Sequence, residues 1–179
     1  MRFASMRNLD ISNGEGVGVS LFVQGCDRHC FNCFNPDTWD FNGGKEWTEE
    51  TKNKFIKLID RPYINRISVL GGEPLAEQNL DEVLSLIKEI RISFPEKTIW
   101  LYTGYKFEDL INGIHYPLDS EWEDKVLRQS IVKLCDVLVD GEYIDEQRDI
   151  TLKWQGSSNQ RVIDAKQSLA QNKIVLYCD

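Results

Sequence analysis

Short apolar runs alternate along this chain with segments whose apolar residues recur at helical spacing. The apolar runs predict strands at residues 17–23, 64–70, 98–102, 137–139 and 174–177. The segments between them predict helices at residues 49–60, at 80–94, from residue 107, at 121–134 and at 160–170. This alternation is typical of a parallel sheet with right-handed crossovers and helices covering its faces. We therefore expect an α/β fold with a mostly parallel sheet of five or six strands.

The residues best suited to chemistry follow the predicted strands directly. Three cysteines follow the first strand, and Gly71-Gly72-Glu73-Pro74 follows the second. Thr103-Gly104-Tyr105 follows the third strand, and Asp140-Gly141 follows the fourth. Ligands of parallel α/β folds collect at the carboxyl ends of the strands. These four segments are therefore predicted to form one site.

Three of the five cysteines, Cys26, Cys30 and Cys33, occupy one Cys-x3-Cys-x2-Cys loop. Thiolates at this spacing suit a metal or cluster that accepts soft ligands. A structural zinc site usually has four protein ligands, and no fourth ligand is evident. A 4Fe-4S cluster held by three cysteines would keep one iron open for a small molecule. Cys135 and Cys178 lie among apolar residues, so we interpret them as small buried hydrophobic residues.

Charge and composition exclude several classes of function. The formal net charge is −8, which disfavours binding to nucleic acid or to an anionic membrane surface. No apolar run approaches the roughly 20 residues of a membrane span, and the N-terminal residues do not resemble a signal peptide. The odd cysteine count argues against a disulfide framework. We expect a cytoplasmic protein with one domain over residues 1–179.

The cysteine loop and Gly71-Gly72-Glu73-Pro74 together resemble the radical S-adenosylmethionine superfamily. Further segments narrow the resemblance to the activating proteins of anaerobic (class III) ribonucleoside-triphosphate reductase, over nearly the whole chain. These segments are Asn13-Gly14 and residues 20–26, 33–39, 102–105, 136–141 and 156–161. The resemblance implies a partial, open β/α barrel, because a complete eight-stranded barrel needs about 250 residues.

The same resemblance implies the cofactors and the reaction. A 4Fe-4S cluster would bind S-adenosylmethionine at its open iron, and a flavodoxin-like electron donor would reduce the cluster. Cleavage of S-adenosylmethionine would give a 5′-deoxyadenosyl radical, which would remove a hydrogen atom from a glycine of the large subunit of the anaerobic reductase. The implied enzyme is thus a glycyl-radical activating enzyme, acting as a homodimer or in a complex with the reductase.

The resemblance also implies roles for individual residues. Cys26, Cys30 and Cys33 would be the cluster ligands. Asn32, Cys33 and Phe34 would lie against the adenine, Asn32 mainly through its backbone. Gly71, Gly72 and Glu73 would meet the methionyl ammonium, because glycines allow close backbone approach and a carboxylate suits a cation. No catalytic residue is expected beyond the cluster ligands.

The segment at residues 155–161 allows two interpretations. Ser157, Ser158, Asn159 and Arg161 would either contact S-adenosylmethionine or serve as helix caps and turn residues. The family often has arginine where this chain has Gln155. A basic contact at that position is therefore not expected.

Two other functions remain compatible with the residues alone. One keeps the superfamily and changes the substrate to another glycyl-radical enzyme or to a small molecule, as in deazapurine synthesis. The other is a zinc-stapled α/β interaction module without catalysis. Metal analysis of protein purified without air would distinguish an iron–sulfur protein from a zinc protein.

Overall fold

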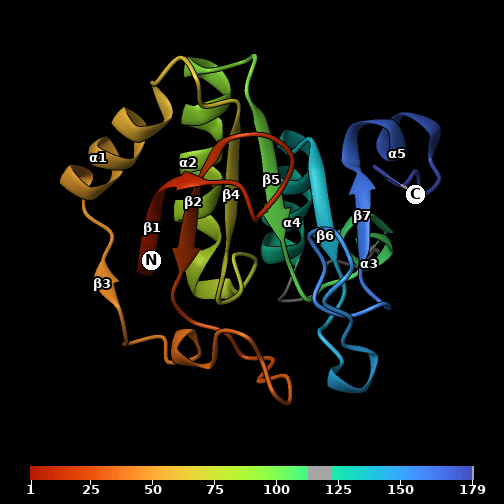
Figure 1. Ribbon diagram of the computed structural model, residues 1–179. Helices are drawn as coiled ribbons and strands as arrows, with labels where there is room; N and C mark the ends of the chain where they lie inside the picture. Colours follow the sequence, from red (N-terminus) through yellow and green to blue (C-terminus); the bar gives the residue numbers. More distant parts are fainter. Residues whose placement is uncertain (113–121, 179) are drawn as a thin grey trace.

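Four parallel strands form the centre of a seven-stranded sheet in the computed structural model, which describes residues 1–112 and 122–178 (Figure 1). They are β2 (Gly18–Val23), β4 (Arg66–Gly71), β5 (Thr98–Tyr102) and β6 (Val137–Asp140). Neighbouring strands in this group pair in parallel, and the order across the sheet is β3-β1-β2-β4-β5-β6-β7. The first four predicted strands are thereby confirmed, and their carboxyl ends share one edge of the sheet.

Three antiparallel strands complete the sheet, and this corrects the predicted number of five or six. β1 (Arg2–Asp10) pairs with β2 and with β3 (Lys45–Glu46), and β7 (Arg161–Asp164) pairs with β6. β1 was not predicted, because only its second and ninth residues, Phe3 and Asp10, are buried and its sequence carries no apolar run. The sheet is open within the described residues, so the α/β class is confirmed without a closed barrel.

The C-terminal part of the chain differs from the prediction. Residues 160–170 were expected to form one helix, but β7 takes its first part and α5 (Ala165–Gln171) begins only at residue 165. In β7, Val162 and Ile163 are buried between the polar residues Arg161 and Asp164. The strand forms because it pairs antiparallel with β6. Asp164 caps α5, so the proposed capping role of Ser158 or Asn159 is wrong. The expected strand at 174–177 makes only one isolated bridge, between Ile163 and Leu176.

The remaining helices follow the predictions. They are α1 (Glu49–Ile59), α2 (Leu80–Ser93), α3 (Phe107–Asn112) and α4 (Trp122–Leu134), with short 3-10 turns at η1 (Pro36–Thr38), η2 (Glu77–Asn79) and η3 (Asp145–Gln147). Thr48 caps α1, because its Oγ1 accepts a hydrogen bond of 3.2 Å from the backbone N–H of Thr51. The predicted break at Gly113 and Pro117 lies outside the described residues. Across the described residues, every helix is too short or too polar to cross a membrane.

Two apolar clusters lie on the two faces of the sheet. Ile99, Leu101 and Leu138 belong to the large cluster that the helices cover. Trp100 and Val137 alternate with them along the strands and belong to a smaller cluster on the opposite face. Cys135 is fully buried in the large cluster, which confirms its interpretation as an apolar residue. Cys178 is only half-buried and packs against the small cluster.

A buried ion pair fixes the loop between β1 and β2. Arg66 and Asp10 have no exposed side-chain surface, and Arg66 Nη2 lies 3.3 Å from Asp10 Oδ1. Arg66 Nη2 also donates to the carbonyl oxygen of Asp10 at 2.7 Å, and Nη1 donates to that of Asn13. Because a buried charge is stable only when it is paired and hydrogen-bonded, Arg66 holds this loop against the small cluster.

Asp10 makes the stability of the fold sensitive to acid. Burial alone would raise the pKa of Asp10, but hydrogen bonds from Asn13 and Ser12 lower it to about 2. This stabilisation, about 2 kcal/mol, is complete above the unfolded pKa near 4 and is lost as the pH falls through about 2. We expect Asp10→Asn to lose about 3 kcal/mol at pH 7, because Arg66 then lacks its buried partner. Urea unfolding between pH 7 and pH 2 measures the free energy of unfolding of both proteins. The difference between Asp10→Asn and the wild type should become smaller below pH 4, and a difference that stays constant would contradict this.

Candidate functional site

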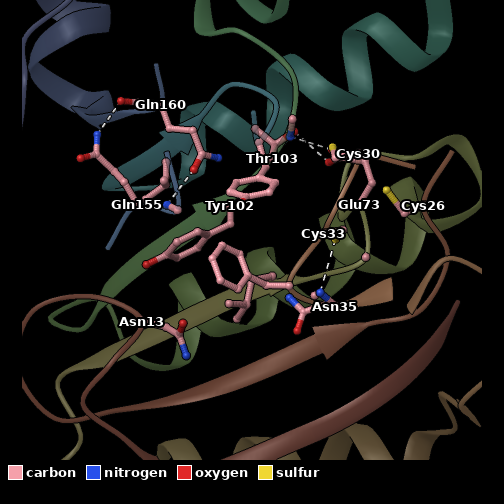
Figure 2. A pocket seen from close by; sticks show the side chains of 18 of the residues that line it. Asn13, Cys26, Cys30, Cys33, Asn35, Glu73, Tyr102, Thr103, Gln155 and Gln160 are labelled. Carbon is pink, nitrogen blue, oxygen red and sulfur yellow. Dashed lines mark hydrogen bonds between the residues drawn. The ribbon is translucent and has the colours of Figure 1, made fainter. Parts of the chain in front are cut away.

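A cavity of about 440 Å³ lies at the carboxyl edge of the parallel strands. Cys26, Cys30 and Cys33 line it together with Gly71-Gly72-Glu73 and Thr103-Gly104. Figure 2 shows the three cysteines on the same side of the cavity as Glu73 and Thr103. The strand-end segments singled out in the sequence therefore converge, as the parallel topology predicted.

The cysteine loop owes its path to backbone hydrogen bonds and to unusual dihedral angles. The N–H of Cys26 donates to the carbonyl of Trp39 at 3.1 Å, and the N–H of Cys33 donates to that of Cys30 at the same distance. His29 and Asn32 have φ angles of 48° and 53°, in the left-handed region that non-glycine residues seldom adopt. These two bends turn the short loop back on itself and bring all three cysteines to the cavity.

The three thiols supply the kind of ligand that an iron–sulfur cluster requires. All are free and half-buried. Three thiols from one short loop supply soft sulfur ligands at a single cavity. This donor set fits a 4Fe-4S cluster, whose irons are held by cysteine thiolates.

The environment of the thiols favours their protonated form until metal is bound. Burial raises the pKa of Cys26, and burial together with the charge of Glu142 raises the pKa of Cys30 to about 11. The Cys30 thiol donates a hydrogen bond to Glu142 Oε1, with 3.6 Å between the sulfur and the oxygen. Cys33 Sγ instead accepts a hydrogen bond of 3.4 Å from the backbone N–H of Asn35. Because ligands bind as thiolates, loading of the site must release protons.

Gly71 and Gly72 bring the turn after β4 against the cysteine loop. Gly71 has a φ angle of 109°, and Gly72 donates its N–H to the carbonyl of Val23 at 3.0 Å. A Cβ atom at Gly72 would overlap the carbonyl oxygen of Gly25 and lie 3.1 Å from that of Thr38. Only glycine therefore permits this contact between the two segments.

Replacing Gly72 with alanine should separate the two segments. We expect a loss of about 2 kcal/mol in unfolding free energy from overpacking, and incomplete iron loading during anaerobic reconstitution. Gly16→Ala is the control for adding a Cβ where there is room, because the nearest atom would lie 3.4 Å from the new Cβ; the φ angle of Gly16, 74°, adds a backbone strain that Gly72 does not have. If Gly72→Ala loaded as much iron as Gly16→Ala, the close contact would not matter for the cluster.

Glu73 is buried and connects three of the strand-end segments. Its Oε1 accepts hydrogen bonds from Leu75 N at 2.9 Å and Thr103 Oγ1 at 2.8 Å. Its Oε2 accepts one from Gly104 N at 2.8 Å and lies 3.4 Å from Arg28 Nε. Burial raises the pKa of Glu73, while these hydrogen bonds and the charge of Arg28 act in the opposite direction. The carboxylate thus fixes the turns after β4 and β5 and the cysteine loop relative to one another.

The two residues expected at the adenine occupy different positions. Phe34 lines the cavity, with its ring 5.0 Å from that of Tyr143 and the Arg148 guanidinium 5.3 Å from its centre. Asn32 is exposed and donates from Nδ2 to Asp145 Oδ2 at 2.8 Å, and it is not among the described residues that line the cavity. In Figure 1 the segments after β2 and after β6, which these contacts join, lie together below the sheet.

Residues 155–161 form a wall of the cavity through hydrogen bonds of their own. Ser157 is buried and its Oγ accepts from Ile144 N at 3.2 Å, while Gln160 Oε1 accepts from Gly156 N at 2.8 Å. Ser158 donates its N–H to the carbonyl of Gln147, and Asn159 Nδ2 donates to that of Glu142. These bonds give the segment a structural role. Gln155, Gly156 and Gln160 line the cavity.

Arg161 and Asp140 are also engaged within the protein. Arg161 donates to both oxygens of Glu108, at 2.9 and 2.7 Å, and forms an ion pair with Asp140. Asp140 Oδ2 also accepts from Phe107 N at 2.8 Å, so both residues connect β6 and β7 to the start of α3. They support the cavity from outside rather than line it.

Arg28 and Tyr102 line the cavity, and neither was assigned a role in the sequence. Arg28 lies within the cysteine loop, and its guanidinium stacks 4.1 Å above the centre of the Tyr105 ring. Tyr102 lines the cavity with a hydroxyl that is buried and unpartnered within the described residues. The position of Arg28 between Cys26 and Cys30 was a usable signal. No sequence pattern marks the Tyr102 hydroxyl.

Comparison with known proteins identifies relatives over most of the chain. A family profile described as a 4Fe-4S single cluster domain matches residues 12–163. Proteins named anaerobic ribonucleoside-triphosphate reductase-activating protein are similar to this chain. The relative from Salmonella typhimurium is 37% identical over 90% of this chain and 97% of its own length, and that from Escherichia coli is 36% identical over the same shares. The relative from Enterobacteria phage T4 is 34% identical over 90% of this chain and 93% of its own.

Proposed function

This chain belongs to the family of anaerobic ribonucleoside-triphosphate reductase-activating proteins, and we propose that its cavity holds a 4Fe-4S cluster on Cys26, Cys30 and Cys33 with S-adenosylmethionine beside it. The chain is a radical S-adenosylmethionine enzyme that activates the anaerobic reductase. One observation carries the assignment of the site: the three thiols and the Gly71-Gly72-Glu73 turn line the same cavity.

When bound, the cofactors would supply the radical chemistry: one electron from an external reductant would cleave S-adenosylmethionine to methionine and a 5′-deoxyadenosyl radical able to take a hydrogen atom from a glycine of the reductase. The chain itself would ligate the cluster, orient S-adenosylmethionine and exclude water from the cavity. Gly71 and Gly72 would present backbone carbonyls to the methionyl ammonium, and Glu73 adds a negative charge beside them. Phe34 and the backbone at Asn32 and Cys33 would lie against the adenine.

The target of the enzyme is the anaerobic reductase, and several exposed apolar side chains beside the cavity support docking of its large subunit. In the cysteine loop, Phe31 is 72% exposed and Phe34 is 56% exposed. Ile150 is 83% exposed in the segment after η3, which also contains the lining residues Leu152 and Trp154. A flavodoxin-like electron donor, a homodimer, a cytoplasmic location, a single domain and a partial barrel are further parts of this proposal, which rest on the family resemblance.

The family membership disfavours the other two functions considered. A zinc-stapled module has no support from a chain that matches a 4Fe-4S domain over most of its length. A different glycyl-radical enzyme or a small-molecule substrate is disfavoured because the relatives carry the name of the anaerobic reductase.

Anaerobic reconstitution tests the proposed function directly. The chain, loaded with iron and sulfide, is mixed with S-adenosylmethionine, a one-electron reductant and the anaerobic reductase from the same genome. We expect a brown protein, release of 5′-deoxyadenosine and a glycyl-radical signal in electron paramagnetic resonance. Absence of 5′-deoxyadenosine from fully loaded protein would refute the assignment.

A further inference from the structure

The last residues of the chain return along the outer edge of β7 after α5 ends. The backbone N–H of Asp164 donates to the carbonyl oxygen of Val175 at 2.9 Å, and the N–H of Tyr177 donates to that of Val162 at 2.8 Å. β7 is the last strand of the sheet on this side, so residues 174–178 form a tail that lies beside it. The tail brings Tyr177 onto the small cluster, on the face of the sheet opposite the helices.

Tyr177 forms a group of three rings with Trp100 and Trp154. The ring centre of Trp100 lies 4.9 Å from that of Trp154 and 5.0 Å from that of Tyr177, the third distance is 6.2 Å, and all three pairs are T-shaped. Trp154 also lines the cavity, and its φ angle is 63°. A bulky residue keeps a left-handed backbone only where its surroundings hold it there. Trp100 and Tyr177 therefore hold Trp154 in place as part of the cavity wall.

The loop between β1 and β2, residues 11–17, forms another part of this wall. Ser12 and Asn13 line the cavity. A Cβ atom at Gly14 would lie 2.8 Å from Trp100 Cδ2, so the loop packs closely against the tryptophan at the centre of the three rings. Figure 1 shows the loop extending across β4 and β5, and in Figure 2 Asn13 lies across the cavity from the cysteines. The loop therefore bounds the side of the cavity away from the cysteine loop.

One hydrogen bond joins this loop to the C-terminal tail. The Tyr177 hydroxyl donates to Glu15 Oε2 at 2.5 Å, and this bond raises the pKa of Tyr177 to about 12. In the part of the chain that the structure describes, residues 11–17 and 174–178 share no other hydrogen bond. The four parallel strands lie between the two segments in the order of the sheet. Because the sheet is open, the bond is a link across its face that the strands themselves do not supply.

From these contacts we propose that Tyr177 is a positioning residue: its ring holds Trp154 and its hydroxyl holds the β1–β2 loop, so that both parts of the wall close on the bound ligand together. The inference rests on the proposed function for the identity of that ligand, S-adenosylmethionine. Tyr177 itself is not among the described residues that line the cavity. A cavity of about 440 Å³ is of the size that encloses one drug-sized molecule. A wall positioned before binding lowers the entropic cost of enclosing it.

A double-mutant cycle on the hydrogen bond tests the proposal. The dissociation constant of S-adenosylmethionine is measured for the cluster-loaded full chain without reductant. We expect Tyr177→Phe and Glu15→Ala each to weaken binding about threefold, and the double variant to bind no more weakly than either, because both changes remove the same bond. Glu15→Gln keeps an acceptor oxygen and should bind as the wild type does. Tyr63→Phe is the matched control, because the exposed Tyr63 hydroxyl accepts from Arg61 Nη1 at 3.0 Å and Tyr63 is not among the described residues at the cavity.

Amide hydrogen exchange of the full chain measures the link independently of the ligand. Tyr177→Phe should raise exchange about threefold in residues 11–17 and in residues 152–156 together, and should leave β4 unchanged. A rise in only one of the two segments, or additive losses of affinity in the double variant, would overturn the proposal. Unchanged affinity for S-adenosylmethionine in Tyr177→Phe would also overturn it. If the paired change in exchange appears but the wild type does not bind S-adenosylmethionine, the proposed function fails while the link between the two parts of the wall stands.

Discussion

Replacing Cys30 with serine is expected to abolish both the iron–sulfur cluster and the formation of 5′-deoxyadenosine. Serine supplies a hard, protonated hydroxyl in place of a soft thiolate, and only two cysteines of the loop then remain. The loss should exceed the 10- to 100-fold effects typical of residues that support metal ligands from outside. Iron and sulfide content, visible absorbance and 5′-deoxyadenosine release measure it in protein reconstituted without air.

Cys178→Ser is the matched control for this variant. Cys178 is half-buried, as Cys30 is, but it packs at the edge of the small aromatic cluster away from the loop. We expect its serine variant to load a full cluster and to retain activity. Equal iron content in Cys30→Ser and Cys178→Ser would show that the Cys-x3-Cys-x2-Cys loop does not ligate the cluster.

The central strands could be predicted because the physics that forms them is local. β2, β4, β5 and β6 are buried on both faces, so their sequences are short apolar runs that end at glycine or polar residues. Because parallel strands share their carboxyl edge, the positions of the cysteine loop and of Gly71-Gly72-Glu73 followed from the topology alone.

The antiparallel margins could not be predicted in the same way. β1 is half-exposed, and its pairing with β2 and β3 depends on contacts between distant parts of the chain. Residues 161–164 are too few to show either the helical spacing or the strand alternation of apolar residues. They form a strand because they pair with β6. Local sequence contains too little of this information, because neighbouring strands override weak propensities.

The site shows the same division between local and long-range information. The positions of the three cysteines could be predicted from spacing. The network around Glu73 joins residues 28, 75, 103 and 104, which come from three separate loops. That network assigns Glu73 a second role, as the residue that holds the turns together, in addition to its proposed contact with the ammonium.

Replacing Glu73 with glutamine is accordingly expected to destabilise the chain as well as to impair its activity. Every protein group around the carboxylate is a donor: Leu75 N–H, Gly104 N–H, the Thr103 hydroxyl and Arg28. Glutamine places an NH₂ group against at least one of these donors and leaves Arg28 without its counter-charge. We expect a loss of about 3 kcal/mol in the free energy of unfolding, from the broken buried pair and the unsatisfied donor.

Urea unfolding of Glu73→Gln, beside Glu77→Gln, separates this effect from a general loss of charge. Glu77 undergoes the same chemical change four residues later, but it is exposed on η2, so its variant should stay within about 0.5 kcal/mol of the wild type. Because Glu73 sets the positions of both Gly72 and Arg28, its variant should also bind S-adenosylmethionine more weakly after cluster loading. If Glu73→Gln matched Glu77→Gln in stability while binding alone declined, Glu73 would act as a ligand contact and not as the connection between the three turns.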